Sequence, residues 1–348
     1  MKSLCRSLGL AVRLGLGAAL ALSSVGCIKS MLINGQIEGT RKGAEAMNTT
    51  SDFEVARIAS TAGLAQFEGM HRLAPDNQDG YYLLVKGYSS YAFAFAEDDM
   101  EQAYLKDDDD LGDYHKARAK ALYTRAIGYG VQWMESKHAG FEVAAKAGDE
   151  KSMEAYLAQF DDKSDADILF WTGQAWMGRT NVTKEAALVG TVYVGKEMIE
   201  RVVELQPDYE KGSPYVLLAS FNARTGVAMI GPESFAKSKE LFDKAKQVGQ
   251  NKILLPDVQM AMTYACRMGD DSPGRRASFE LYGKLLAGVL NAEAPDADVR
   301  LLNAIAKRKA RRYLSQKWIE ENSAEDCGWE FGAMAGGPPV PPVTVKSE

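Results

Sequence analysis

The sequence has 348 residues, of which 46% are hydrophobic and 25% charged, with 41 basic against 47 acidic side chains. A formal net charge of −6 argues against general nucleic-acid binding and for a hydrated surface. The length exceeds that of one ordinary globular domain, but a repeat array can run this long as a single body.

Residues 1–27 are predicted to be an export signal of the bacterial lipoprotein type. Lys2 and Arg6 precede an apolar stretch, Leu14–Val25, and small residues lead into Cys27. In this interpretation Cys27 becomes the acylated N terminus and holds the rest of the chain on a membrane. Removing these residues takes away three basic side chains and no acid, so the remaining chain is more acidic.

Two details bear on this prediction. Ser24 stands where lipoprotein signals usually carry Leu, so ordinary signal cleavage and a plain membrane anchor remain alternatives. Ile28, rather than Asp, follows Cys27, and by resemblance to bacterial lipoproteins this favours the outer membrane of a Gram-negative cell.

Helical periodicity dominates residues 52–327, and we expect an all-α fold with no strands. The prolines of this region fall near the ends of the periodic segments, as expected of helix boundaries. The predicted helices are Asp52–Leu73, Tyr81–Glu97, Tyr114–Tyr129, a run around Phe141–Gln159, Ile168–Met177, Leu188–Gln206, Tyr215–Thr225, Ser234–Val248, Leu255–Met268, Ala277–Leu290 and Asp298–Leu314.

Two internal patterns recur at fixed spacing. A Pro-Asp pair ends a helix in both halves, in Gly63, Phe67, Pro75, Asp76 and in Gly195, Ile199, Pro207, Asp208. A small, aromatic, small triplet occurs at Ala119, Tyr123, Ala126 and at Ser238, Phe242, Ala245. Such patterns are typical of tetratricopeptide hairpins, so we predict a superhelical stack of degenerate tetratricopeptide-like hairpins that acts as a scaffold.

Other segments suggest sites that their details do not support. Asp107–Asp110 and Asp113 resemble a calcium loop only superficially, because Leu111 and Arg118 stand where carboxylates are needed. We expect a solvated acidic linker, with loose cation binding as the alternative. Gly190 to Lys196 has phosphate-loop spacing but is predicted to lie inside a helix.

Catalytic and metal-binding patterns are missing from the sequence. His71, His115 and His138 are isolated, and no HExxH, CxxC or GxSxG segment is present. We therefore predict a protein that is not an enzyme and needs no cofactor or metal.

Aromatic residues are the strongest candidates for binding. Trp171 and Trp176 point to different faces of one predicted helix, and Tyr82 and Tyr88 lie on another. These side chains are either buried between hairpins or exposed in a groove for a ligand or partner.

The C-terminal part raises three further expectations. Lys307 to Arg312 give the last helix a basic face, predicted to be solvated, with docking to an acidic partner or anionic lipid as the alternative. Residues 328–348, rich in Gly and Pro, are predicted to be a disordered tail beyond an α-helical domain of residues 28–327. Cys266 and Cys327 are expected to be unpaired, and a disulfide between them is the alternative.

The order of several short segments resembles the TatT family, the tetratricopeptide-containing T component associated with tripartite ATP-independent periplasmic (TRAP) transporters. The segments, between about Gly35 and Leu314, are Tyr82 to Ala92, Leu122 to Ala126, Leu169 to Trp176, Arg201 to Leu205 with Pro207 to Tyr209, and Leu302 to Ala310. Ile230-Gly231-Pro232 departs from the family pattern, where a Gly-Gly turn is expected.

The resemblance implies a lipoprotein that faces the periplasm and partners the substrate-binding P component of a TRAP transporter. It also implies a hydrophobic ligand held between hairpins. From the residues of this chain itself, the candidates for binding a ligand or partner are Tyr82, Tyr88, Trp171, Trp176 and Asn303. An adaptor in outer-membrane or cell-wall assembly is the alternative function. Ligand identity and self-association into a homo-oligomer stay open.

Overall fold

The computed structural model describes residues 30–268, 272–293, 296–323, 327 and 329. The predicted signal, Cys27 and the tail from Gly332 to Glu348 lie outside the described residues. All regular structure in the described ranges is helical, without strands, which confirms the all-α prediction.

The described chain starts with a helix of residues 30–44, which continues into η1 (Glu45–Thr49). The first half then contains α2 (Phe53–Leu73), α3 (Gln78–Tyr91), η2 (Ala92–Ala96), α4 (Glu97–Leu105), α5 (Asp109–Lys137), α6 (Phe141–Ala147), α7 (Glu150–Leu157) and α8 (Asp165–Thr183). The second half contains α9 (Ala186–Val189), α10 (Val192–Leu205), η3 (Tyr209–Gly212), α11 (Ser213–Phe221), η4 (Asn222–Gly226), α12 (Val227–Met229), α13 (Glu233–Val248), α14 (Leu255–Thr263), η5 (Ala265–Arg267), α15 (Ser272–Asn291), η6 (Ala297–Val299), α16 (Arg300–Tyr313), α17 (Gln316–Trp318) and η7 (Ile319–Ser323).

The ends of α2 show how local sequence sets a helix. Asp52 caps its start, and one carboxylate oxygen accepts from the N–H groups of Glu54 and Val55 at 2.9 and 3.0 Å. The helix ends at Leu73 because Ala74 precedes Pro75 and takes a non-helical conformation, with φ −143° and ψ 75°.

The two Pro-Asp pairs are followed by the same backbone irregularity. After Pro75-Asp76, α3 passes through the π-helical turn η2 into α4, and after Pro207-Asp208, α11 passes through the π-helical turn η4 into α12. The repeat that is visible in the sequence therefore extends to the backbone geometry of both halves.

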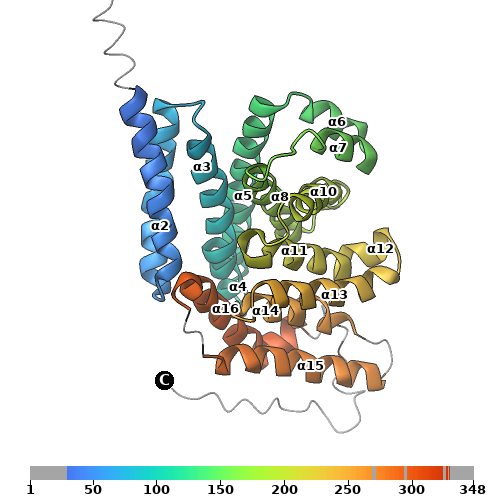
Figure 1. Ribbon diagram of the computed structural model, residues 1–348. Helices are drawn as coiled ribbons and strands as arrows, with labels where there is room; N and C mark the ends of the chain where they lie inside the picture. Colours follow the sequence, from blue (N-terminus) through green and yellow to red (C-terminus); the bar gives the residue numbers. More distant parts are fainter. Residues whose placement is uncertain (1–29, 269–271, 294–295, 324–326, 328, 330–348) are drawn as a thin grey trace, which may run out of the picture.

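Helices that are neighbours along the chain pack side by side, in the order α2, α3, α5, α8, α10, α11, α13, α14, α15 and α16 (Figure 1). The α8–α10 interface depends on Gly173 and Gly195, whose backbones touch. A Cβ added at Gly195 would lie 3.0 Å from the carbonyl oxygen of Gly173 and 2.9 Å from Met177 Cγ. Only residues without a side chain allow this approach.

The last long helix returns to the beginning of the chain. α16 packs against η1 and α2, and η6 packs against η1 (Figure 1). Ile305 of α16 is buried with Ala56, Tyr91 and Phe95 from the first hairpin. The helices thus close on themselves, while a tetratricopeptide-like superhelix stays a prediction.

We call the contact of α4 with α16 the closing interface. Asp98 and Glu101 of α4 face Arg308, Lys309 and Arg312 of α16. Arg308 Nε donates to both Asp98 carboxylate oxygens at 2.9 and 3.0 Å, and Arg312 bridges the Asp98 and Glu101 carboxylates. Asp98, Lys309 and Arg312 are buried.

This interface corrects the expectation of a solvated basic face on the last helix for Arg308, Lys309 and Arg312, whereas Arg311 is exposed as expected. The acidic partner of that face is α4 of the same chain. Arg57 of α2 joins the network through Asp99, at 2.5 Å, and Asp98, at 3.5 Å.

The expectation of two unpaired cysteines is also wrong. Cys266 and Cys327 form a disulfide, with their Cα atoms 4.6 Å apart. Close by, Trp329 is buried against Phe279 and Tyr282, and its indole N–H donates to Ser278 Oγ at 3.0 Å. The folded body therefore reaches past residue 327, the predicted domain boundary.

Candidate interaction site

Tyr82 and Trp171 come together in a cluster of aromatic and charged side chains between α3 and α8. Lys86, one turn after Tyr82, donates from Nζ to Tyr82 Oη at 2.9 Å and to Glu210 Oε1 at 3.0 Å. The same ammonium lies 4.8 Å from the centroid of the Trp171 ring, a cation–π distance. We call these residues, with Arg41, Asp79, Asp167 and Tyr209, the α3–α8 cluster.

Asp167, in the first turn of α8, connects the rest of the α3–α8 cluster. Its two carboxylate oxygens accept from Tyr209 Oη at 2.6 Å and from Arg41 at 2.5 Å. Arg41 also donates to Asp79 at 2.6 Å, and its guanidinium lies 3.9 Å above the centroid of the Tyr82 ring. Arg41 thereby ties the N-terminal helix to both α3 and α8.

Most charges of the cluster are paired. Burial opposes the charged form of Lys86, but Glu210 and Tyr82 outweigh it and raise the pKa of the ammonium. Burial and the neighbouring Asp167 carboxylate hold the pKa of Tyr209 well above its usual value. Lys86 thus stays charged and Tyr209 neutral at physiological pH, which suits a fixed structural network more than acid–base chemistry.

One group of the cluster is left without a partner. The indole N–H of buried Trp171 has no hydrogen-bond acceptor among the described residues. An unpaired buried donor costs free energy, so this N–H is the point where the cluster could donate to a bound molecule.

Tyr88, another predicted binding residue, belongs to a separate group around Glu68. The Glu68 carboxylate accepts from Tyr88 Oη at 2.8 Å, from Tyr129 Oη at 2.7 Å and from Arg125 Nε at 2.7 Å. Burial acts against ionisation, but these hydrogen bonds and the charge of Arg125 lower the pKa of Glu68 to about 2. Tyr88 therefore links α3 to α2.

Trp176 lies on another face of α8, as the sequence predicts. Its indole N–H donates to the Thr191 carbonyl at 2.9 Å, and its ring lies 6.0 Å from Phe141 and 5.2 Å from the Arg179 guanidinium. Arg179 Nε is buried without a hydrogen-bond partner in the described chain, and burial lowers its pKa.

Asn303 is remote from the aromatic candidates in sequence and in its contacts. Its side chain is buried, donating to the Lys252 carbonyl and accepting from the Leu254 N–H, both at 2.9 Å. Both ends of the amide are thus used to hold the segment before α14 against α16.

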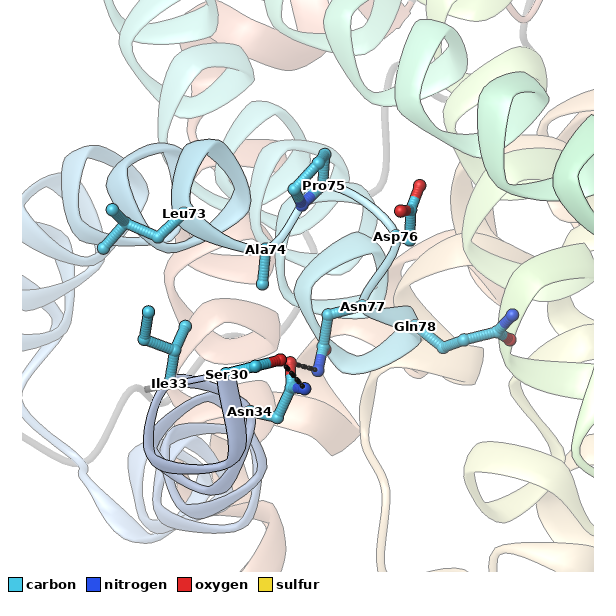
Figure 2. A pocket seen from close by; sticks show the side chains of 9 residues that line it. All are labelled: Ser30, Ile33, Asn34, Leu73, Ala74, Pro75, Asp76, Asn77 and Gln78. Atoms are coloured by element: carbon cyan, nitrogen blue, oxygen red, sulfur yellow. Dashed lines mark hydrogen bonds between the residues drawn. The ribbon is translucent and has the colours of Figure 1, made fainter. Parts of the chain in front are cut away.

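The hollows on the surface of the described residues include the following two. One of about 640 Å³ lies between the N-terminal helix and the α2–α3 turn, where Asn77 Nδ2 donates to Asn34 Oδ1 at 2.9 Å (Figure 2). The other, of about 450 Å³, lies between the end of α5 and α6 and is lined by Val131, Phe141 and Ala145 with charged neighbours. Because Phe141 contacts the Trp176 ring, Trp176 lies directly behind the second hollow.

The acidic run before α5 has structural roles. Asp108 caps α5, accepting from the Leu111 N–H at 3.1 Å, and Asp113 accepts from Tyr104 Oη at 2.7 Å. Within the described ranges, no three His, Cys, Asp or Glu side chains gather as metal ligands would. None of the helices in the described part of the chain is long and apolar enough to cross a bilayer.

Comparison with known proteins identifies the family. The family model of the TRAP transporter T-component matches residues 49–318. The chain belongs to the TRAP transporter T-component family. The match covers every helix from α2 to α16 and all of the α3–α8 cluster except Arg41, whose helix precedes it.

A relative is found in Treponema pallidum (strain Nichols), described as an uncharacterized protein. The two chains are 27% identical over 179 residues, which are 51% of this chain and 53% of the relative. The chain thus spans about half the length of this curated relative. By this match, the protein is a member of a family of transporter components.

Sequence reasoning missed the charged members of the α3–α8 cluster. Lys86 follows Tyr82 at i+4, so its contact with that ring has a sequence signal. Asp167 and Glu210 have none, because their partners are remote in sequence and meet them only through helix packing.

Proposed function

We propose that the protein is a non-enzymatic, lipid-anchored T component on the periplasmic side of the envelope, attached to the outer membrane through Cys27. In this proposal it docks the periplasmic substrate-binding P component of a TRAP transporter and holds a hydrophobic ligand. The observation that carries the proposal is the family match over residues 49–318.

The structure supports a docking role through a rigid body with one unusual surface run. Val227, Ala228, Met229 and Ile230 are four consecutive exposed apolar residues, with Val227 39%, Met229 47% and Ile230 51% exposed. Such runs are uncommon on a monomer surface unless a partner covers them. The run comprises α12 and the residue after it, at the side of the molecule opposite α2 (Figure 1), and that residue, Ile230, begins the segment that departs from the family pattern.

The hollow beside Trp176 supports the ligand part of the proposal. Its apolar lining of Val131, Phe141 and Ala145 suits a hydrophobic moiety, and Glu142 and Lys146 at its rim can hold polar atoms. Substituting Ala145→Phe should fill this hollow and reduce the ligand recovered per protein, while Ala59→Phe on the exposed face of α2 should leave it unchanged.

The test combines crosslinking in cells with mass spectrometry of extracted lipid. A photoreactive residue at Met229, compared with one at exposed Val143, should capture a periplasmic solute-binding protein selectively. Solvent extracts of the purified signal-free chain should contain a stoichiometric hydrophobic compound. Capture of outer-membrane assembly factors by an empty protein would instead establish the adaptor function.

A further inference from the structure

We infer that the edge carrying Met31, Leu32 and Leu73 lies in the surface of the lipid leaflet that holds the anchor, so that the body stands in one orientation on the membrane. This inference rests on the proposed lipid attachment at Cys27. It adds how the folded body itself meets the bilayer. We call these three residues the N-terminal edge.

The N-terminal edge exposes unusually large apolar side chains. Met31 is 78% exposed, Leu32 69% and Leu73 65%. They come from two segments that lie side by side, because Ile33 of the N-terminal helix and Leu73 of α2 line the same hollow (Figure 2). Single exposed apolar residues are ordinary, but here three occur on two adjacent segments close to the start of the described chain.

The short distance in sequence between Cys27 and the N-terminal edge indicates that a membrane covers this edge. The described helix begins at residue 30, three residues after Cys27, and three extended residues span at most about 10 Å. A lipid on Cys27 would therefore bring a membrane surface within reach of Met31 and Leu32. No long linker is available to hold the body away from the bilayer.

The N-terminal helix is fastened to the body, so an anchor at its start would fix the orientation of the whole fold. Ile37 is fully buried in a cluster with Met70 and Leu83. Arg41 pairs with Asp79 and Asp167, which belong to α3 and α8. A helix held by buried packing and by two ion pairs does not swing as a free tether would.

Ile58, an exposed apolar residue of α2, lies too far along that helix to share the leaflet surface with Leu73. Ile58 is 69% exposed, equal to Leu32, but it lies 15 residues before Leu73 on α2, about 22 Å along the helix. Ile58 is therefore a matched control for Leu32. The family match starts at residue 49, so the helix carrying Met31 and Leu32 is a feature outside the matched region.

The experiment uses the full acylated protein in zwitterionic phosphatidylcholine vesicles that contain a phospholipid with a photoreactive headgroup. After illumination, mass spectrometry maps the labelled peptides, and the intact mass of the N-terminal peptide reports the lipid on Cys27. We expect peptides containing Met31, Leu32 and Leu73 to carry at least about tenfold more label than those containing Ile58 or Met229.

Variants sharpen the test. The variants are made in a chain that starts at residue 27 and carries Cys27→Ser, so that it has no acyl chain. In this background the double substitution Met31→Asp and Leu32→Asp should reduce the fraction of protein that floats with vesicles severalfold. Ile58→Asp should not reduce this fraction. These residues are exposed, so circular dichroism should show unchanged folding. Equal labelling at Ile58, or flotation unaffected by the double substitution, would overturn the inference. Absence of lipid on Cys27 would instead contradict the proposed anchoring.

Discussion

The α8–α10 interface and the closing interface join helices by different means. α8 and α10 are close in sequence and meet through the bare backbones of Gly173 and Gly195. α4 and α16, about two hundred residues apart, meet through buried charges such as Asp98 and Arg312. Apolar contact tolerates small shifts, whereas a buried ion pair out of place leaves uncompensated charge. Complementary shape therefore suffices to position helices that are neighbours in sequence. Charge pairing fixes the register of helices that are distant in sequence.

The largest expected effect comes from removing one charge of the closing interface. Asp98→Ala leaves Arg312 and Arg308 without their shared carboxylate, and breaking a buried pair in this way costs about 3–5 kcal/mol. Chemical denaturation measures the loss in free energy of unfolding. The exposed Glu38–Lys42 pair is the control, since Glu38→Ala should leave the free energy of unfolding nearly unchanged. A loss below 1 kcal/mol at Asp98 would show that charge does not hold this interface.

At the α8–α10 interface the corresponding change is steric. Gly195→Ala places a Cβ against the Gly173 carbonyl oxygen and should destabilise by about 1–3 kcal/mol, despite the better helix propensity of Ala. Gly69→Ala in α2 meets no atom within 4 Å and should be neutral or stabilising by up to about 1 kcal/mol. Similar denaturation midpoints for the two variants would refute close packing at Gly195.

The pH dependence of the closing interface has a defined sign. Burial raises the pKa of Glu97 to about 7, against 4.5 when unperturbed, although Lys309 and the hydrogen bond from Tyr123 Oη oppose the shift. The neutral acid thus stabilises the fold fully below pH 4.5, and this contribution is lost as the pH rises through 7.

Glu97→Gln keeps a neutral side chain at every pH. The variant should match the wild type near pH 4.5 and exceed its stability at pH 8 by roughly 1–3 kcal/mol, measured by denaturation at both values. A difference that does not change with pH would mean that Glu97 ionises normally.

The smallest effect is expected at the exposed rim of the same interface. Lys317 Nζ pairs with Asp107 at 2.6 Å, but the Asp107 side chain is 75% exposed. Lys317→Ala should lower the free energy of unfolding only slightly, and added salt should erase the difference. A larger, salt-resistant loss would extend the ionic character of the interface to its surface.

Local signals predicted the helices well where they were unambiguous. The predicted range Asp52–Leu73 matches α2, apart from its N-cap residue, because an Asp cap and a following Pro mark its ends. The acidic run before Tyr114 was interpreted as a linker, yet Asp109 and Asp110 form the first turn of α5. Acidic residues stabilise a helix N terminus, so the same residues fit both interpretations until the helix is seen.

The sequence predicts the aromatic residues of the candidate site but not the charged residues that contact them. Tyr82 and Trp171 were selected for their ring chemistry, but their meeting through Lys86 depends on how α3 packs on α8. The basic residues of α16 and the acids of α4 are both plain in the sequence. Their pairing is not visible in the sequence, because local sequence signals do not indicate which distant helices contact each other.

The return of α16 to the first hairpin also limits how such a chain can evolve. An open array can gain or lose a repeat at its end and simply become longer or shorter. Here an inserted hairpin would move Arg312 away from Asp98 and leave unpaired charges on both α4 and α16. The number of helices between α4 and α16 is thus fixed by closure, and new properties must arise through loops and surfaces such as α12.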